Sequence, residues 1–517
     1  METVFTLSQC LREILARYGV SASELSRRMG FSSRNSVFRI LNGECSPEKQ
    51  REFLDRLVGC AALPLTEQEL SDLERGMEVS REGAERFYIN RAMEEIVLPN
   101  GSEVRELQII HWQRGAETKE RFGDWLGRIF RCECVRLLIV GCCERSVFAA
   151  LAKEIAGGRA HDVQITHYID ATGIQLVRAI AAIQPVLYCG GYQAYMFEGS
   201  GQSRLYECDM VLATCVDGEG RCRSMQAIMT DESSFYCCEF EDDAPSAFLT
   251  HILTRNAQAM KPIKSAFMRP ASPMDYLQYT ELYRQIEEDT ILYDVKSDVP
   301  INYIHPDILL EPVRDGFAQA GFCEAEEREA LVQAFYDVQL RRWENFFGKR
   351  KPTHTIFTYE RMRDFALTGR QSDHFFAIRP YTPQERVKIL RFLRRQTADN
   401  PYFTVYFFRQ GVTPVQDEIG LYEGKGVLLT RPHTDYRLDG EHAEALITQR
   451  EFCDCFREYY QRKLLAGCVT SARETLAIMD ELIALASGQN DGKNRSGGIS
   501  RNHQDKGRKE DEHGKVR

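Results

Sequence analysis

Residues 23–43, which read SELSRRMGFSSRNSVFRILNG, decide the fold of the N-terminal part of this chain. Leu25 and Met29 have the spacing of one apolar helix face, and Gly30 supplies the positive φ that a tight turn needs. A second helical pattern covers residues 33–41 and stops at an Asn-Gly pair, which is typical of a helix end. The stretch therefore predicts two short helices joined by a turn.

This pattern resembles the phage lambda repressor/Cro (XRE-type) helix-turn-helix family over about 55 N-terminal residues. Ser26 matches the small residue where the two helices of the pair cross, and Gly30 matches the turn. Ser32 looks like a one-residue insertion in that turn, which shifts the register of the second helix. The resemblance implies an all-α, lambda repressor-like N-terminal domain that binds double-stranded DNA.

The resemblance also implies that the helix from Ser33 lies in the major groove. Arg reads guanine and Asn reads adenine with paired hydrogen bonds, so Arg34 and Asn35 are the candidates for base readout. The other candidates on the exposed face are Ser33, Ser36, Phe38 and Arg39. We expect phosphate contacts, which position the duplex, from Arg27, Arg28 and Asn42.

Charge is unevenly distributed along the chain. The whole sequence of 517 residues has a formal net charge of -10, yet residues 1–58 hold nine Lys/Arg against seven Asp/Glu. A weakly basic head on an acidic body fits a protein that touches DNA at one end. The composition, 43% hydrophobic and 27% charged, is that of a globular chain able to bury several cores.

Periodicity predicts a multidomain chain in which an α/β body of one or two units follows the head. The apolar run 135–140 favours a buried strand, whereas three prolines within 258–275 favour a linker. We expect a helix-turn-helix domain at 1–60, a helical connector at 61–103, an α/β domain at 104–260, a helical segment at 261–350, a second α/β unit at 351–487 and a disordered tail at 488–517. No clear internal repeat is visible, which leaves open that the two α/β units are distant duplicates.

One helix-turn-helix domain binds weakly, so specific binding favours a homodimer that reads two half-sites. The paired helices at 67–97 are the candidate dimerisation element, and the alternative is that they pack on their own subunit. This architecture resembles that of one-component bacterial switches, in which an effector biases the geometry of a dimer. We therefore predict a transcriptional regulator with an unidentified small-molecule effector.

The competing hypothesis is an enzyme or enzyme-derived body that carries a DNA-targeting domain. The segment 433–444 gathers two histidines and four carboxylates, which suit metal binding or acid–base chemistry, or a plain polar loop. The α/β body with this histidine faintly resembles the phospholipase D superfamily. That family requires His-x-Lys with a later Asp, and this combination is absent from the sequence. Our expectation is accordingly that the chain is not an enzyme and has no catalytic residues.

The 17 cysteines predict reduced thiols of a cytoplasmic protein, mostly buried, with a thiol sensor at Cys142 and Cys143 as the alternative. The cysteine pairs lack the spacing of a zinc site, so we expect no metal and no cofactor. Residues 1–10 lack the pattern of a secretory signal. No apolar run is long enough to span a membrane, and we expect no membrane partner.

Overall fold

The chain is described by a computed structural model. It describes the residues in the ranges 5–31, 33, 35–59, 62–97, 124–141, 145–156, 162–169, 173–187, 189, 191–197, 209–216, 222–229, 235–240, 260–268, 273–320, 324–348, 350–371, 378–409, 412, 418–431 and 442–488. The predicted tail at 488–517 lies outside these residues except for Gly488.

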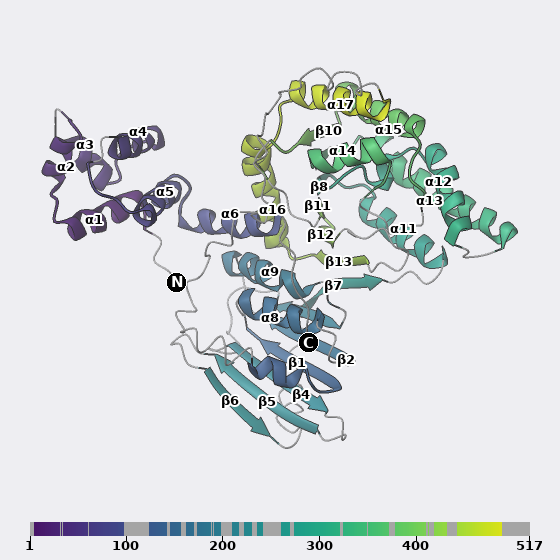
Figure 1. Cartoon of the computed structure of the whole chain (residues 1–517), viewed down its shortest axis with the longest axis horizontal. Coiled ribbons are helices and arrows are strands. Elements are labelled where there is room, and N and C mark those ends of the chain that lie inside the picture. The colour runs from purple at the N-terminus through teal and green to yellow at the C-terminus, as the bar shows by residue number, and fades with distance from the viewer. Residues whose placement is uncertain are drawn as a thin grey trace, which may run out of the picture.

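Five helices form an N-terminal head, which we define as α1 to α5. Their bounds are α1 Leu7–Tyr18, α2 Ala22–Arg28, α3 Asn35–Leu41, α4 Pro47–Gly59 and α5 Glu67–Glu82. Thr6 and Thr66 begin α1 and α5 with capping boxes, in which the Thr side chain and a Gln or Glu three residues on satisfy backbone donors. The head projects from one side of the body (Figure 1).

The head has its own hydrophobic core, and that core continues past the predicted domain boundary at residue 60. Leu11, Leu25 and Val37 are completely buried in it, and Leu73 of α5 belongs to the same cluster. A Cβ on Gly76 of α5 would lie 2.9 Å from the backbone nitrogen of Leu7, so α5 and α1 are in close contact. The predicted connector is therefore split, because its first helix is part of the head.

The second connector helix, α6 (Ala84–Val97), belongs to the body instead. Ala92, Met93 and Ile96 of α6 lie in the largest hydrophobic cluster of the body. Both helices predicted at 67–97 thus bury their apolar faces within their own chain. This packing matches the alternative that the sequence left open, in which the helices pack on their own subunit, and the homodimer stays a prediction.

The described strands of the body form one 13-stranded sheet in the order β10-β9-β8-β11-β12-β13-β7-β3-β2-β1-β4-β5-β6. The strands are β1 Cys134–Val140, β2 Asp162–Ile169, β3 Tyr192–Phe197, β4 Asp209–Val216, β5 Cys222–Met229, β6 Phe235–Phe240, β7 Met260–Met268, β8 Leu292–Lys296, β9 Thr353–Phe357, β10 Phe403–Phe407, β11 Glu418–Tyr422, β12 Gly426–Arg431 and β13 His442–Ile447.

The sheet consists of two units with the same strand order. In the first unit, β1 to β6, three parallel strands (β3-β2-β1) are followed by three antiparallel ones (β4-β5-β6). In the second unit, β8 to β13, the parallel strands β10-β9-β8 are followed by the antiparallel strands β11-β12-β13. The described strands thus repeat one topology, which is what distant duplicates would show.

The strand β7 joins the two units, and here the sequence-based linker at 258–275 is wrong. β7 pairs antiparallel with β13 of the second unit and with β3 of the first unit. Pro262 lies within β7 opposite Tyr195, although proline lacks the N–H that a central strand donates. The prolines of this segment favoured a linker in the prediction, although the segment contains a strand.

The predicted helical segment at 261–350 is also only partly correct. It contains α11 (Pro273–Glu287), α12 (Pro306–Ala320) and α13 (Ala325–Phe347), but β8 lies between them and starts the second unit. The predicted boundary at 351 therefore falls inside the second unit, between β8 and β9.

Helices cover the sheet. Those of the first unit are α8 Arg145–Ala156 and α9 Gly173–Leu187; those of the second are α14 Tyr359–Thr368, α15 Pro383–Asp399, α16 Arg450–Tyr459, a π-helix Tyr460–Cys468 and α17 Ala472–Ala486. One hydrophobic cluster runs from β1 and α9 of the first unit to β8, β12 and α16 of the second. A separate cluster lies under α11 to α15 and α17 in the second unit alone. Among the described residues, no helix has the length and apolar character needed to cross a membrane.

Candidate functional site

The exposed face of α3 carries most of the predicted DNA-contacting residues. Asn35, Arg39 and Asn42 are exposed, Ser36 is half-buried, and Phe38 has 41% of its surface exposed. Ser33 is exposed just before the helix, and its Oγ accepts a hydrogen bond from the backbone N–H of Asn35 at 3.2 Å. Arg34 lies outside the described residues. The structure thus brings six of the predicted residues to one outer surface of the head.

The turn between α2 and α3 has the geometry that the sequence pattern predicts. Gly30 has φ +66°, a value that favours glycine, so this prediction is confirmed. Ser26 is 3% exposed, and its Oγ donates to the backbone oxygen of Ser33 at 3.1 Å. This small buried residue ties α2 to the start of the second helix of the pair.

Arg56 of α4 also holds this turn, and the sequence analysis missed it. Its Nε donates to the carbonyl of Met29 at 2.9 Å, and one Nη donates to that of Gly30 at 3.1 Å. Its guanidinium lies 4.4 Å from the ring centre of Phe31, which stacks in turn on Phe53. Arg56 stands 26 positions after Gly30, so no local spacing could have revealed the contact.

The predicted phosphate-contacting arginines are paired within the head. Arg27 and Arg28 both contact the carboxylate of Glu24, and their side chains are 75% and 43% exposed. Ion pairs of such exposure contribute about 0–1 kcal/mol, so a phosphate can replace the carboxylate at low cost. Asn42 accepts a hydrogen bond from Arg12 at 3.4 Å and donates to Glu44 at 3.3 Å.

A second candidate site lies at the carboxyl ends of β8 and β9 in the second unit. Lys296, which ends β8, donates to the carboxylate of Glu418 at 2.7 Å, and the backbone N–H of Ser297 donates to the same group at 3.0 Å. The side chains of Lys296 and Glu418 are 10% and 2% exposed. Ligands of α/β sheets often bind at this edge of the parallel strands.

Asp294 lies on the same face of β8 as Lys296. The hydroxyl of Tyr303 donates to its Oδ2 at 3.3 Å and also contacts Thr355 at 2.7 Å. Burial raises the pKa of Asp294 to about 7, against the lowering effect of Lys296. Its Oδ1 is buried and has no hydrogen-bond partner among the described residues. A carboxyl group that titrates near neutral pH can give or take a proton.

Two further buried polar groups lie in the second unit. Glu287 of α11 accepts two hydrogen bonds from Arg342 of α13 at 2.6 and 2.7 Å and one from Asn302 at 2.9 Å. Glu444 of β13 contacts the hydroxyls of Tyr279 and Tyr283, and burial raises its pKa to about 8. Local spacing does not indicate these partners, because they come together only when segments far apart in the chain pack.

The predicted acidic and histidine cluster at 433–444 is described only in part. Residues 432–441 lie outside the described residues, and so does the side chain of His442. Only Glu444 is described, and it faces α11. In the part of the chain that the structure describes, no group of three or more His, Cys, Asp or Glu is arranged to hold a metal.

Two of the described cysteines, Cys10 and Cys453, have pKa values above the usual range of a thiol. Burial raises the pKa of Cys453 to about 11, which keeps it a thiol at neutral pH. Cys142 and Cys143, the predicted sensor pair, lie outside the described residues.

No protein-family model and no curated protein matches this chain. Among solved structures, it matches phosphatidylserine synthase of Haemophilus influenzae Rd KW20 with 10% identity and a TM-score of 0.26, over 78% of this chain and 98% of that one. It also matches polyphosphate kinase from Porphyromonas gingivalis with 8% identity and a TM-score of 0.18, over 63% of this chain and 46% of that one.

These matches correct one expectation. Both are to structures of enzymes, a synthase and a kinase, and against them the expectation that this chain is not an enzyme does not stand. Identities and TM-scores this low carry no argument about a substrate or a shared site.

Proposed function

We propose that this chain is a DNA-binding regulator whose head reads double-stranded DNA with the exposed face of α3. The observation that carries the proposal is a helical pair, fixed at Gly30 by Ser26 and Arg56, that presents Asn35, Phe38 and Arg39 outward. Figure 1 shows α3 on the side of the head away from the body, where a duplex can approach.

The residue types on this face suit a major groove. Asn35 and Arg39 carry donors that match base edges, and the aromatic ring of Phe38 suits the methyl group of thymine. Phe38 is 41% exposed, so its ring is accessible for such a contact. Arg27 and Arg28 lie on the preceding helix, where phosphate contacts position the duplex.

The test is a selection of binding sites from random DNA with the full chain, followed by affinity measurements on the selected sequence. Asn35→Ala and Arg39→Ala should each weaken binding roughly ten- to a hundredfold, since a good base contact contributes about 1–3 kcal/mol. The matched control is Arg75→Ala on α5, an exposed arginine that pairs with Asp72 within the head. Failure of the selection to enrich any sequence would refute the proposal.

A phosphate contact should behave differently from a base contact. Arg28→Ala should weaken binding to all sequences alike and lower the slope of log Kd against log salt by about 1. A loss restricted to the selected sequence would instead show that Arg28 reads a base.

The homodimer and the small-molecule effector complete this proposal. Two half-sites in a selected palindrome would support the dimer, and analytical ultracentrifugation of the free chain measures it directly. Because α5 and α6 pack within their own chain, we place the dimer contact on another surface of the protein.

A second candidate function is binding or acid–base chemistry on a polar small molecule at the edge formed by Lys296 and Glu418. The observation that favours it is the group of buried charges there, with one oxygen of Asp294 left without a partner among the described residues. Buried charges are costly to desolvate, and titratable groups perturbed by burial cluster at functional sites. Mass spectrometry of molecules released from the denatured protein should find a polar compound that Lys296→Met, with an unchanged circular dichroism spectrum, no longer retains. A wild-type protein that releases nothing, and whose melting is unaffected by a metabolite library, would exclude this candidate.

A further inference from the structure

The head is joined to the body through a single glycine. α5 ends at Glu82, α6 begins at Ala84, and Gly83 between them has φ +85° and ψ +149°. The backbone therefore bends at one residue, with the head on one side and a helix of the body core on the other. A one-residue joint of this kind leaves the direction of the head to be fixed by side chains.

Side chains on both sides of Gly83 meet at Glu82. Its carboxylate contacts Lys463 of the π-helix and Arg81, and it accepts a hydrogen bond from Asn90 of α6 at 2.7 Å. The side chain of Glu82 is 11% exposed and that of Lys463 is 29% exposed. Although burial raises the pKa of Glu82, the hydrogen bonds from Lys463, Arg81 and Asn90 lower it overall, so the group stays charged.

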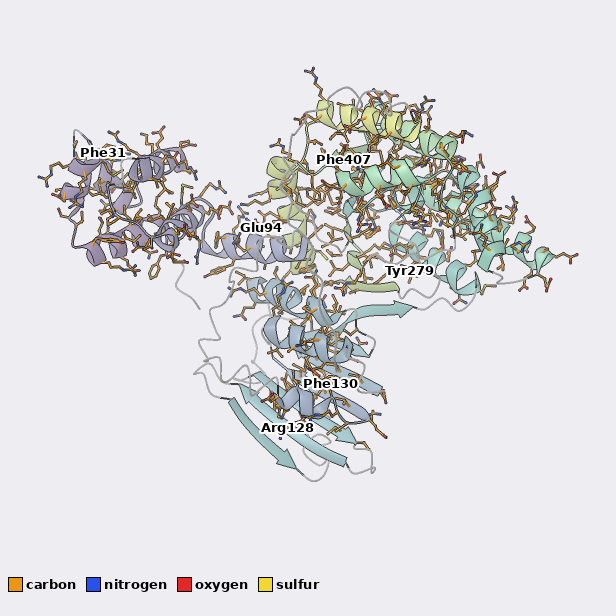
Figure 2. The ribbon with its side chains drawn as sticks, in the orientation of Figure 1. Phe31, Glu94, Arg128, Phe130, Tyr279 and Phe407 are labelled. Carbon is orange, nitrogen blue, oxygen red and sulfur yellow. The ribbon has the colours of Figure 1, made fainter. Side chains whose placement is uncertain are left out.

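A second ion pair lies one turn further along α6, where Arg86 contacts Glu458 of α16. Both side chains are more than 40% exposed, so this pair contributes little by itself. Glu94, also on α6, lies beside the body in Figure 2, and burial raises its pKa. These two residues of α6 lie within the body, whereas the pair Glu82–Lys463 joins α5 of the head to the body.

The π-helix that supplies Lys463 is also bonded to the sheet of the second unit. The hydroxyl of Tyr460 is buried and donates to the backbone oxygens of His354 at 2.7 Å and Asp294 at 3.0 Å. These two residues belong to the neighbouring parallel strands β9 and β8, and Asp294 is part of the second candidate site. π-Helices are rare and often mark functional positions.

We infer that Glu82 and Lys463 form a clasp that orients the head, and that Tyr460 makes this orientation depend on strands β8 and β9. A change at the second candidate site shifts the strand carbonyls that Tyr460 binds, then the π-helix, and then the end of α5. The two-state element is the joint at Gly83, with the clasp closed or open. This inference rests on the proposed function only for its effect on DNA.

The clasp is tested without DNA, by hydrogen–deuterium exchange of the amides at 78–90 in the full chain. Glu82→Gln should speed their exchange by up to about fivefold, as expected for loss of one partly exposed ion pair. Arg75→Gln, which removes an exposed pair on the same helix, is the control and should leave that exchange unchanged. The exchanged pair Glu82→Lys with Lys463→Glu should be slower than either single variant. Equal exchange in wild type and Glu82→Gln overturns the clasp.

The link to the second unit is tested with Tyr460→Phe, which removes one hydroxyl and keeps the ring. Exchange at 78–90 should rise, although Tyr460 lies in a different helix from Glu82. A change confined to 292–296, 353–357 and 460–468 overturns this part of the inference.

The effect on DNA separates this inference from the proposed function. If the wild type selects a DNA sequence, Glu82→Gln should bind it several-fold more weakly, because a mobile head loses more entropy on binding. An unchanged affinity would show that the clasp does not act on the DNA-binding face. If the wild type selects no sequence, the proposed function fails, while the exchange experiments still decide the clasp.

Discussion

The two units of the sheet share one strand order but bury different side chains. On the face that contributes to the common hydrophobic cluster, β1 presents Val135, Leu137 and Ile139, and β8 presents Tyr293 and Val295. On the opposite face, β1 carries Leu138 and Val140 with an exposed Arg136, whereas β8 carries Leu292, Asp294 and Lys296, all buried. The two strands therefore differ in whether the charges on this face are buried, and the buried charges of β8 show where a site is to be sought.

The first unit has its own buried polar residue, but it is of another kind. His167 of β2 is fully buried, and its two ring nitrogens contact the hydroxyl of Tyr192 at 2.8 Å and the carbonyl of Gly141 at 2.7 Å. Both nitrogens have partners within the unit, so His167 is satisfied as a structural residue. Asp294, with an oxygen that lacks a partner among the described residues, is not.

The largest expected effect is from breaking a buried ion pair of the second unit. Arg342→Met leaves the carboxylate of Glu287 buried without its cation, which should cost about 3–5 kcal/mol of unfolding free energy. Urea unfolding measures this loss. Arg314→Met removes an exposed pair with Glu329 and should cost at most about 1 kcal/mol. Equal losses of unfolding free energy in both variants would show that the surroundings of Glu287 are not a low-dielectric environment.

The pH dependence of Asp294 should distinguish the second unit. The pKa of its carboxyl rises from 3.8 to about 7 on folding, so the folded protein holds a proton that the unfolded chain has lost. The contribution of this group to the free energy of unfolding is complete below pH 4. It decreases as the pH rises to 7, by roughly 4 kcal/mol at most. The Asp294→Asn variant has no titrating group at this position. Its free energy of unfolding, measured with urea, should therefore rise relative to that of the wild type over this pH range. A gap that does not change with pH would argue against a buried, titrating Asp294.

His167 should give the opposite pH dependence in the first unit. Burial lowers its pKa from 6.5 to about 4, so the stability from neutral His167 is full above pH 6.5. That stability is lost as the pH falls to 4, by about 3 kcal/mol. The stability gap between wild type and His167→Gln should therefore narrow on acidification. If it widens instead, the histidine is protonated in the folded protein.

The smallest expected effect tests whether the two units unfold together. Thr382 begins α15 of the second unit with a capping box, and Thr382→Ala should cost about 1 kcal/mol. Because one hydrophobic cluster spans both units, amide exchange in β1 and β2 should rise along with that in β9 and β10. Faster exchange in the second unit alone would mean that the units unfold separately.

Sequence spacing predicted local features well and missed those made at long range. The turn at Gly30 and the strand at 135–140 both depend on neighbours within a few residues, and both are found. β8 was missed because two charged residues interrupt a run of only five.

The candidate sites also divide into features that depend on near neighbours and contacts that are made at long range. The outward face of α3 could be read from helical spacing. The contacts of Arg56 with the turn, of Lys296 with Glu418 and of Lys463 with Glu82 join segments 26, 122 and 381 positions apart. Their energy depends on packing that no local pattern contains. The hydrophobic pattern gave the head its fold, while the polar contacts had to be found in three dimensions.

The strand β7 has a consequence for dividing this protein into pieces. It covers the open hydrogen-bonding edges of β13 and β3 at once, so a cut on either side of it leaves at least one long strand edge unpaired. Unpaired edges attract strands of other molecules and promote aggregation. A fragment that ends before residue 260, or one that begins after residue 268, should be insoluble unless β7 is supplied with it.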